Sequence, residues 1–304
     1  MPKLTAADVA KKAQALYKPA DKARDIITTG ANLKRPTKPE DFVTLPEGHP
    51  WMKLTGLLGL PYNYIVQVAG AEDSGKSTLA GEFMAAAQKQ GVYVVLGDAE
   101  LGFNPVRYDK HFGGNHKDIN IVQSTMIRAI AGGMFKYVKA IKAADTKAKI
   151  LLVHDSIGGS VSKARLEHDI DSDKGTQPGS EAVENSDYMK HATALMDRYP
   201  DSITLLLINQ LTDKIGFRQK GKSRPGGHKL SFHSRVIIEL KKIKTLTKVV
   251  DKVKMKTGII IKASVDKNQL ALTDLSVKEM NVSVTPKGWQ ETDFAFGKDS
   301  EESE

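Results

Sequence analysis

Residues 70–78 have the types and spacing that bind polyphosphates. The segment Gly-Ala-Glu-Asp-Ser-Gly-Lys-Ser-Thr fits the pattern G-x-x-x-x-G-K-[ST] at every fixed position. Glycines in such a loop let backbone N–H groups turn toward phosphate oxygens, the lysine reaches the β- and γ-phosphates, and the following hydroxyl can ligate Mg²⁺. We therefore predict a nucleotide site with Mg²⁺. Its predicted nucleotide-binding residues are Gly70, Ala71, Glu72, Asp73, Ser74, Gly75, Lys76, Ser77 and Thr78.

Carboxylates follow two apolar segments further along the chain. Asp155 comes directly after residues 150–154 and can complete the metal site with Ser77. Glu100 comes after residues 92–97, where a carboxylate beside the phosphates can orient and deprotonate an attacking water. Asp98 competes for that role, and the pattern alone leaves the two open.

The elements that position these residues alternate along the chain. Uniformly apolar segments predict strands that are buried on both faces, as in a parallel sheet covered by helices. We therefore predict an α/β fold with a mostly parallel twisted sheet flanked by helices. The predicted strands are residues 64–69, 92–97, 150–154 and 203–208, and the predicted helices are 78–89, 125–144 and 181–199. Later strands at 236–240 and 259–261 are predicted to form an extended sheet edge.

The chain ends differ from this central pattern. Residues 1–45 are predicted to form an arm, because an apolar helical stripe before Pro19 must pack on the main body or on another copy. A core is predicted over residues 46–288. Residues 289–304 are predicted to be a C-terminal segment, whose last seven residues carry four acids and one base.

Composition limits the classes of protein. The 304 residues include 45 Lys and Arg against 36 Asp and Glu, and no cysteine, which excludes disulfides and thiolate metal sites. No apolar run reaches the roughly 18 residues of a membrane helix, and no secretory signal is evident, so a soluble cytoplasmic protein is expected. Residues 229–267 carry eleven bases against three acids, which favours a polyanionic partner. A solvated lysine-rich face is the alternative.

Four motifs in register resemble the RecA family of recombinases, including the RecA-like recombinases of bacteriophages. They are the phosphate loop, Asp98-Ala99-Glu100, Asp155-Ser156 and Ile208-Asn209-Gln210, and the match covers roughly residues 45–265. The resemblance implies a RecA-like P-loop ATPase core with an N-terminal helical oligomerisation arm. It also implies ATP and Mg²⁺ as cofactors, with ATP hydrolysis that depends on DNA.

The resemblance assigns roles to further residues. Glu100 looks like the family's catalytic glutamate, and Gln210 looks like the glutamine that senses the γ-phosphate. Lys76 of the phosphate loop is the third predicted catalytic residue. Asn104 matches a turn near the adenine, where either Arg107 or Tyr108 is expected to stack on the base. Of two family lysines that enter the neighbouring subunit's site, Lys262 matches the first. Ser264 stands at the second, and whether Lys267 substitutes is open.

Two loops would contact DNA in such a protein. The first spans roughly residues 163–185 and carries several acids. The second lies between Gln210 and Lys229, where cations on a glycine-rich loop suit phosphates and one aromatic ring suits bases. A solvated loop is the alternative. The predicted DNA-binding residues are Lys214, Phe217, Arg218, Lys220, Lys222, Arg224, Gly226, Gly227 and Lys229.

Some features depart from the family pattern. Only about forty residues follow the strand at Ile259, so the family's globular C-terminal domain is expected to be missing, whereas an acidic tail is retained. Residues 243–256 look like a lysine-rich insertion that adds DNA contacts. The arm lacks a clean aromatic anchor, for which Ile26-Ile27 or Phe42-Val43 are candidates.

The resulting hypothesis is a recombination and repair protein that forms helical filaments on single-stranded DNA. It would pair that strand with a homologous duplex and exchange strands, aided by single-strand-binding and mediator proteins, in a bacterium or a phage-infected cell and not at a membrane. The first alternative is a hexameric DNA helicase with the same core. The second is a non-catalytic DNA-binding regulator with a degenerate ATPase, which the intact Lys76, Ser77, Glu100 and Asp155 disfavour.

Overall fold

The computed structural model describes residues 35–166, 179–213, 222–223, 228–271 and 277–294. The chain divides into one compact unit over Met1–Arg35 and a second over Pro36–Glu304. All helices and strands given below lie in the second unit. The predicted N-terminal helix and Ile26-Ile27 lie outside the described residues.

A nine-stranded sheet organises the described part of the chain. Its order is β13-β12-β11-β10-β3-β7-β6-β4-β5. The strands from β10 to β5 pair in parallel, whereas β10 to β13 pair antiparallel. The predicted mostly parallel α/β fold is therefore confirmed. Bounds are β3 Ile65–Gly70, β4 Tyr93–Asp98, β5 Ile119–Gln123, β6 Ile150–Asp155, β7 Ile203–Gln210, β10 Ser234–Val250, β11 Val253–Asn268, β12 Glu279–Thr285 and β13 Gly288–Glu291.

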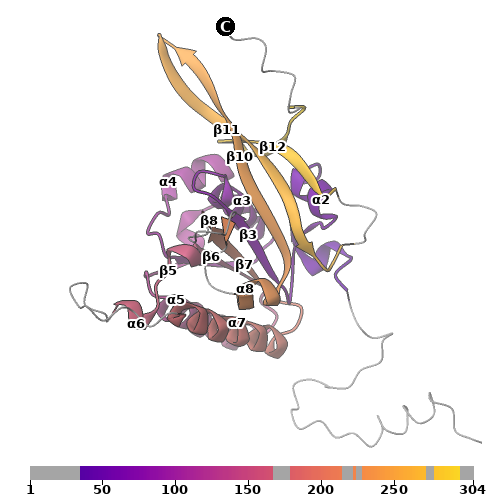
Figure 1. Ribbon diagram of the computed structural model, residues 1–304. Helices are drawn as coiled ribbons and strands as arrows, with labels where there is room; N and C mark the ends of the chain where they lie inside the picture. The colour runs from indigo at the N-terminus through magenta and orange to yellow at the C-terminus, as the bar shows by residue number, and fades with distance from the viewer. Residues whose placement is uncertain (1–34, 167–178, 214–221, 224–227, 272–276, 295–304) are drawn as a thin grey trace, which may run out of the picture. The chain divides into compact units, whose positions relative to one another are not determined.

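Helices cover both faces of this sheet. Successive strand residues alternate between two buried clusters, so Leu206 packs on the side of α3 and Leu205 on the side of α5 and α7. Figure 1 shows α5 and α7 side by side along one face of the sheet. Burial on both faces explains why these strands are apolar throughout. The helices are α2 Pro50–Thr55, α3 Lys76–Lys89, α4 Pro105–Arg107, α5 Ile127–Ala144, α6 Lys163–Leu166, α7 Ser180–Arg198 and α8 His228–His233.

Short elements complete the described chain. Single turns of helix are η2 Pro39–Asp41, η3 Tyr108–Phe112, η4 His116–Asp118 and η5 Ile157–Gly159, and two small strand pairs are β1 Phe42–Thr44 with β2 Gly59–Pro61 and β8 Thr212–Asp213 with β9 Lys222–Ser223. No helix in the described ranges is long and apolar enough to cross a membrane.

The C-terminal half of the sheet differs from the expected edge. Instead of two short strands, β10 and β11 form a long antiparallel hairpin in the interior of the strand order, and the edge on this side is β13. Residues 243–256, interpreted from sequence as an insertion, are the distal part of this hairpin, which projects beyond the other strands in Figure 1. Asp251 and Lys252 make its turn with positive φ angles of 49° and 65°.

Residues near the predicted domain boundaries pack into the core. Phe42 and Val43 are 3% and 0% exposed, so they belong with the unit that begins at Pro36, and their burial rules them out as an exposed oligomerisation anchor. Trp289, at the start of the predicted C-terminal segment, is 3% exposed in β13. The compact unit therefore begins before residue 46, and its sheet continues past residue 288.

Candidate nucleotide-binding site

The phosphate loop connects β3 to α3 at the carboxyl edge of the parallel strands. Gly70 ends β3, where a Cβ atom would lie 2.8 Å from the carbonyl oxygen of Leu240 on β10, so no larger residue fits without a shift. Gly75 precedes α3 with a φ of 85°, a conformation that glycine adopts without strain. At both positions of the motif, the local structure thus explains why the residue is glycine. The loop leads into the N-terminus of a 14-residue helix, where unpaired N–H groups favour anions.

The Lys76 ammonium group lies inside this loop. Its Nζ donates a 2.7 Å hydrogen bond to the carbonyl oxygen of Ala71, which also accepts one from Ser74 Oγ at 2.7 Å. Lys76 is 8% exposed, and burial lowers the pKa of its side chain while the nearby Asp155 and Glu100 oppose that shift. A cation held beside the loop's backbone groups is suited to bind a phosphate.

Asp155 and Ser77 lie together at the end of β6 and the start of α3. Burial raises the pKa of Asp155 to about 6, while a hydrogen bond from the Ser77 hydroxyl acts in the opposite direction. The nearby carboxylates of Glu100 and Asp98 raise the pKa further. Carboxylate and hydroxyl oxygens are ligands that Mg²⁺ takes in proteins. The residues present therefore fit a divalent cation.

Glu100 accepts hydrogen bonds from the ends of two other strands. Gln210, the last residue of β7, donates from Nε2 to Glu100 Oε1 at 2.6 Å. Ser156, which follows β6, donates from Oγ to the same oxygen. Because β7, β6 and β4 are neighbours in the sheet, their carboxyl ends meet at this one carboxylate. Glu100 itself is exposed to solvent.

Asp98 is used differently from Glu100. It is 3% exposed, and its oxygens accept hydrogen bonds from the backbone N–H groups of Gly102 at 3.1 Å and Phe103 at 3.2 Å. Gln123 Nε2 donates to it at 3.3 Å. Asp98 therefore holds the loop after β4, and Glu100 is the carboxylate that water can reach.

A pocket of about 410 Å³ opens beside the phosphate loop. One wall is the loop and the start of α3, and the opposite wall comes from β11 and the end of β12. The lining comprises residues 73–78, Arg107, His111, 256–259 and 284–286. Arg107 Nη2 donates to Thr78 Oγ1 at 3.2 Å, which holds the guanidinium at the pocket. Sequence reasoning missed His111 and the β11 and β12 lining, because no local motif marks them.

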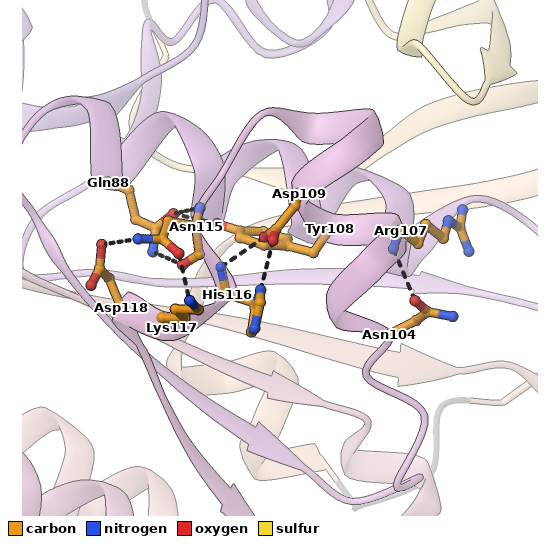
Figure 2. A network of polar contacts seen from close by, with 9 residues as sticks. All are labelled: Gln88, Asn104, Arg107, Tyr108, Asp109, Asn115, His116, Lys117 and Asp118. Atoms are coloured by element: carbon orange, nitrogen blue, oxygen red, sulfur yellow. Dashed lines mark hydrogen bonds and ion pairs between the residues drawn. The ribbon is translucent and has the colours of Figure 1, made fainter.

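The segment that carries Arg107 is fixed by side-chain hydrogen bonds (Figure 2). Asn104 Oδ1 caps α4 by accepting from the Arg107 N–H at 2.9 Å. Tyr108 OH donates to Gln88 Oε1 at 2.9 Å, and its ring, 2% exposed, packs between Phe103 and Phe112. Of the two residues expected to stack on a base, only Arg107 lines the pocket beside the phosphate loop. The Tyr108 ring belongs to the core, yet it also lines a second pocket of about 220 Å³ together with Arg107 and Asn104, so which of the two residues stacks on a base stays a prediction.

The lysines expected at a subunit boundary lie away from that pocket. Lys262, on β11, forms an ion pair of 2.8 Å with Glu279 and lines a separate pocket of about 530 Å³ with Lys241 and Lys242. Lys267 Nζ donates at 2.9 Å to the carbonyl oxygen of Ser231 in α8. Lys267 therefore contacts the end of a helix in its own chain, not the phosphate loop.

The predicted DNA loops are described only at their ends. Of the second loop, Lys214, Phe217, Arg218, Lys220, Arg224, Gly226 and Gly227 lie outside the described residues. Lys222 is in β9, whose pairing with β8 begins two residues after Gln210. Lys229 is exposed on α8, with its ammonium 5.6 Å from the centre of the Phe232 ring. Of the first loop, residues 163–166 form α6, and α7 begins at Ser180, before the expected end at residue 185.

Comparison with known proteins agrees with this architecture. The family model of the RecA N-terminal domain matches residues 37–285. Protein RecA of Fusobacterium nucleatum is 33% identical over 221 residues, which cover 71% of this chain and 53% of that protein. Protein RecA of Mesomycoplasma hyopneumoniae strain J is 30% identical, covering 71% of this chain and 60% of that protein. That of Blastochloris viridis is 32% identical, covering 62% and 51%. The chain thus spans between about half and three fifths of the length of these relatives.

Proposed function

Since the chain belongs to the RecA family, we propose that it is an ATP-dependent recombination protein that forms helical filaments on single-stranded DNA and exchanges strands with a homologous duplex. The observation that carries this proposal is the hydrogen bond from Gln210 to Glu100. It joins the candidate general base to the residue from which the basic segment 211–229 starts. A bacteriophage type of the family stays a prediction.

In this proposal ATP binds along the phosphate loop and α3. Lys76 and the loop N–H groups bind the β- and γ-phosphates, and Arg107 lies against the base or ribose. Asn104 fixes the turn before Arg107. Ser77 and Asp155 would hold Mg²⁺, which offsets the negative charge of the phosphates when bound.

Glu100 acts on the attacking water. Its carboxylate orients the water and accepts a proton as the water oxygen bonds to the γ-phosphorus, and the bond electrons leave with ADP. Lys76 stabilises the charge that develops on the transferred phosphoryl group. The hydrogen bonds from Gln210 and Ser156 hold the Glu100 carboxylate toward the ends of the three strands.

Gln210 would couple nucleotide state to DNA. A γ-phosphate beside Gln210 competes with Glu100 for its amide, and a change at Gln210 is passed to the segment that follows β7. The cations of that segment, Lys214 to Lys229, would contact DNA phosphates. By the same family reasoning, a neighbouring copy would present Lys262 to the site, and residues 1–45 would join subunits.

Electron microscopy with single-stranded DNA tests this proposal. Filaments that form with a slowly hydrolysed ATP analogue and not with ADP are expected. Closed rings would favour the hexameric motor instead, and dispersed particles would leave only a nucleotide-binding DNA regulator. Lys76→Ala is expected to abolish ATP-dependent DNA binding, and strand exchange at the wild-type rate in that variant would refute the mechanism.

A further inference from the structure

A carboxylate lies within the phosphate loop, where phosphates would repel it. Asp73 has a φ of 55° and borders the same pocket as Ser74 to Thr78. A negative charge in the loop lowers the affinity of the loop for a polyphosphate unless a positive group compensates that charge. Sequence reasoning placed Asp73 in the loop but offered no compensating group.

The compensating groups come from the β10–β11 hairpin. Asp73 Oδ2 lies 2.7 Å from Lys242 Nζ and 2.5 Å from Lys256 Nζ. The two lysines are 169 and 183 residues away in sequence, one on each strand of the hairpin. Hydrogen bonds from both hold the pKa of Asp73 below its usual range.

We propose that Lys242 and Lys256 neutralise Asp73 and thereby make the nucleotide affinity of the phosphate loop depend on the position of the β10–β11 hairpin. The proposal rests on the proposed function in one respect, that the loop binds a nucleotide. An anion that draws these lysines away would weaken nucleotide binding. By linkage, a bound nucleotide would hold the lysines near the loop.

The size of the effect follows from the exposure of the three side chains. The side chain of Asp73 is 50% exposed, that of Lys242 34% and that of Lys256 48%. Pairs this hydrated contribute modestly and weaken as salt rises. We therefore expect removal of one lysine to weaken ADP binding about two- to fivefold at low salt and by less at high salt.

Lys242 gives the cleanest test, because Lys256 lines the pocket and can touch the nucleotide directly, whereas Lys242 does not line it. ADP binding with Mg²⁺ is measured by calorimetry on the full chain at low salt. Lys242→Met should bind ADP about two- to fivefold more weakly, and Lys242→Arg, which keeps the charge, should bind as the wild type does. Asp73→Asn should bind at least as tightly as the wild type, and it should remove the loss in the double variant Asp73→Asn with Lys242→Met.

Two matched controls separate this local effect from a general change in charge. Lys248 is exposed further along β10, so Lys248→Met removes the same charge from the same strand. Asp251 also has a positive φ, 49°, so Asp251→Asn repeats the Asp73 substitution at the hairpin turn. Both controls should bind ADP as the wild type does.

The single and double variants of Asp73 and Lys242 distinguish the ways in which the inference could fail. Wild-type affinity in Lys242→Met would overturn the inference, as would a double variant as weak as Lys242→Met alone. A wild-type protein that binds no ADP would overturn the proposed function, and the inference with it. Circular dichroism and melting temperature identify any variant that does not fold. If Lys242→Met does not fold, the ADP affinities of Lys242→Arg and Asp73→Asn test the inference instead, because the first variant keeps Asp73 compensated and the second removes its charge.

Discussion

Gln210 Nε2 donates a 2.6 Å hydrogen bond to Glu100 Oε1 and so connects the end of β7 with the end of β4 across the intervening β6. Ser156, after β6, donates to the same oxygen. Residues at the ends of two neighbouring strands therefore fix one carboxylate that follows a third strand. A ligand that drew the hydrogen bond of Gln210 away from Glu100 would change the orientation of the Glu100 carboxylate. It would also change the start of the segment after β7.

Gln210→Ala should separate DNA binding from ATP hydrolysis. The variant loses the amide that contacts Glu100, while the phosphate loop and Lys76 are unchanged. We expect stimulation of ATP hydrolysis by single-stranded DNA to fall at least roughly fivefold, the size of a typical coupling between sites. ADP affinity should change less than about twofold. Hydrolysis rates with and without DNA, together with ADP calorimetry, measure the two effects.

Stimulation equal to that of the wild type in Gln210→Ala would show that Gln210 does not carry the signal. Gln210→Glu is a useful companion, because it places a second carboxylate beside Glu100. Repulsion between the two should raise the pKa of the pair. The hydrolysis rate of this variant should therefore be lower at neutral pH and recover as the pH rises.

Glu100→Gln and Asp98→Asn should have different effects. Removal of a general base costs roughly 10²- to 10⁴-fold in rate, so Glu100→Gln should lower the ATP turnover number by that factor and still bind ATP. Asp98 accepts two backbone N–H groups, so Asp98→Asn should mainly lower the melting temperature. Steady-state hydrolysis and thermal unfolding of both variants make the comparison. A larger loss of turnover in Asp98→Asn would reverse the assignment.

Much of the parallel half of the fold could be predicted from sequence, because its signals are local. The strand at residues 150–154 is apolar on both faces, and the observed β6 is one residue longer. The phosphate loop was predicted residue by residue, since its motif lies between a strand and a helix. The carboxyl-edge positions of Glu100, Asp155 and Gln210 follow from strand ends, which the apolar runs mark well.

The hairpin and its contacts could not be predicted in the same way. Around Lys248 and Lys254 the distal strands alternate lysine with Thr, Val and Met and are exposed on both faces, so no buried periodicity marks them as strands. The pairing of Asp73 with Lys242 joins residues 169 positions apart and depends on tertiary structure alone. Likewise, the local sequence does not show which of Arg107 and Tyr108 is buried, because only tertiary packing decides this for two adjacent side chains.

Arg107→Ala and Tyr108→Phe should have different effects, the first on the KM for ATP and the second on stability. Arg107 lines the pocket and donates to Thr78, so its removal should raise the KM for ATP roughly three- to tenfold. Tyr108→Phe loses only the hydrogen bond to Gln88, which should cost about 1 kcal/mol of unfolding free energy and leave KM unchanged. A rise in KM for Tyr108→Phe alone would assign Tyr108, and not Arg107, as the residue beside the base.

The contribution of Asp73 to ADP binding should be steady between pH 8 and pH 5. Hydrogen bonds from Lys242 and Lys256 hold the pKa of Asp73 below the ordinary aspartate value of 3.8. A lowered carboxyl pKa means that the pairing is present above 3.8 and is lost only as the pH falls through the lowered value. The ratio of ADP affinities of wild type and Lys242→Met should therefore stay constant over that range. A ratio that approaches one by pH 5 would contradict the assigned charge state.

Lys142 offers a stability test that is separate from the nucleotide site. It is 3% exposed in α5, and its Nζ donates to the carbonyl oxygens of Ala148 at 2.5 Å and Thr146 at 3.1 Å. Burial lowers the pKa of Lys142, yet the two carbonyls need its N–H groups. Lys142→Met keeps the volume of the stem and leaves the carbonyl of the buried Ala148 without this donor, which should cost about 1–3 kcal/mol.

The melting temperature of Lys142→Met should accordingly fall by roughly 2–4 °C for each kcal/mol in a chain of this size. Lys136→Met removes the same charge from an exposed position on the same helix and should melt with the wild type. ADP affinity should be unchanged in both variants, because neither residue lines the pocket beside the phosphate loop. Equal melting temperatures for Lys142→Met and Lys136→Met would mean that the turn after α5 does not depend on the buried ammonium group.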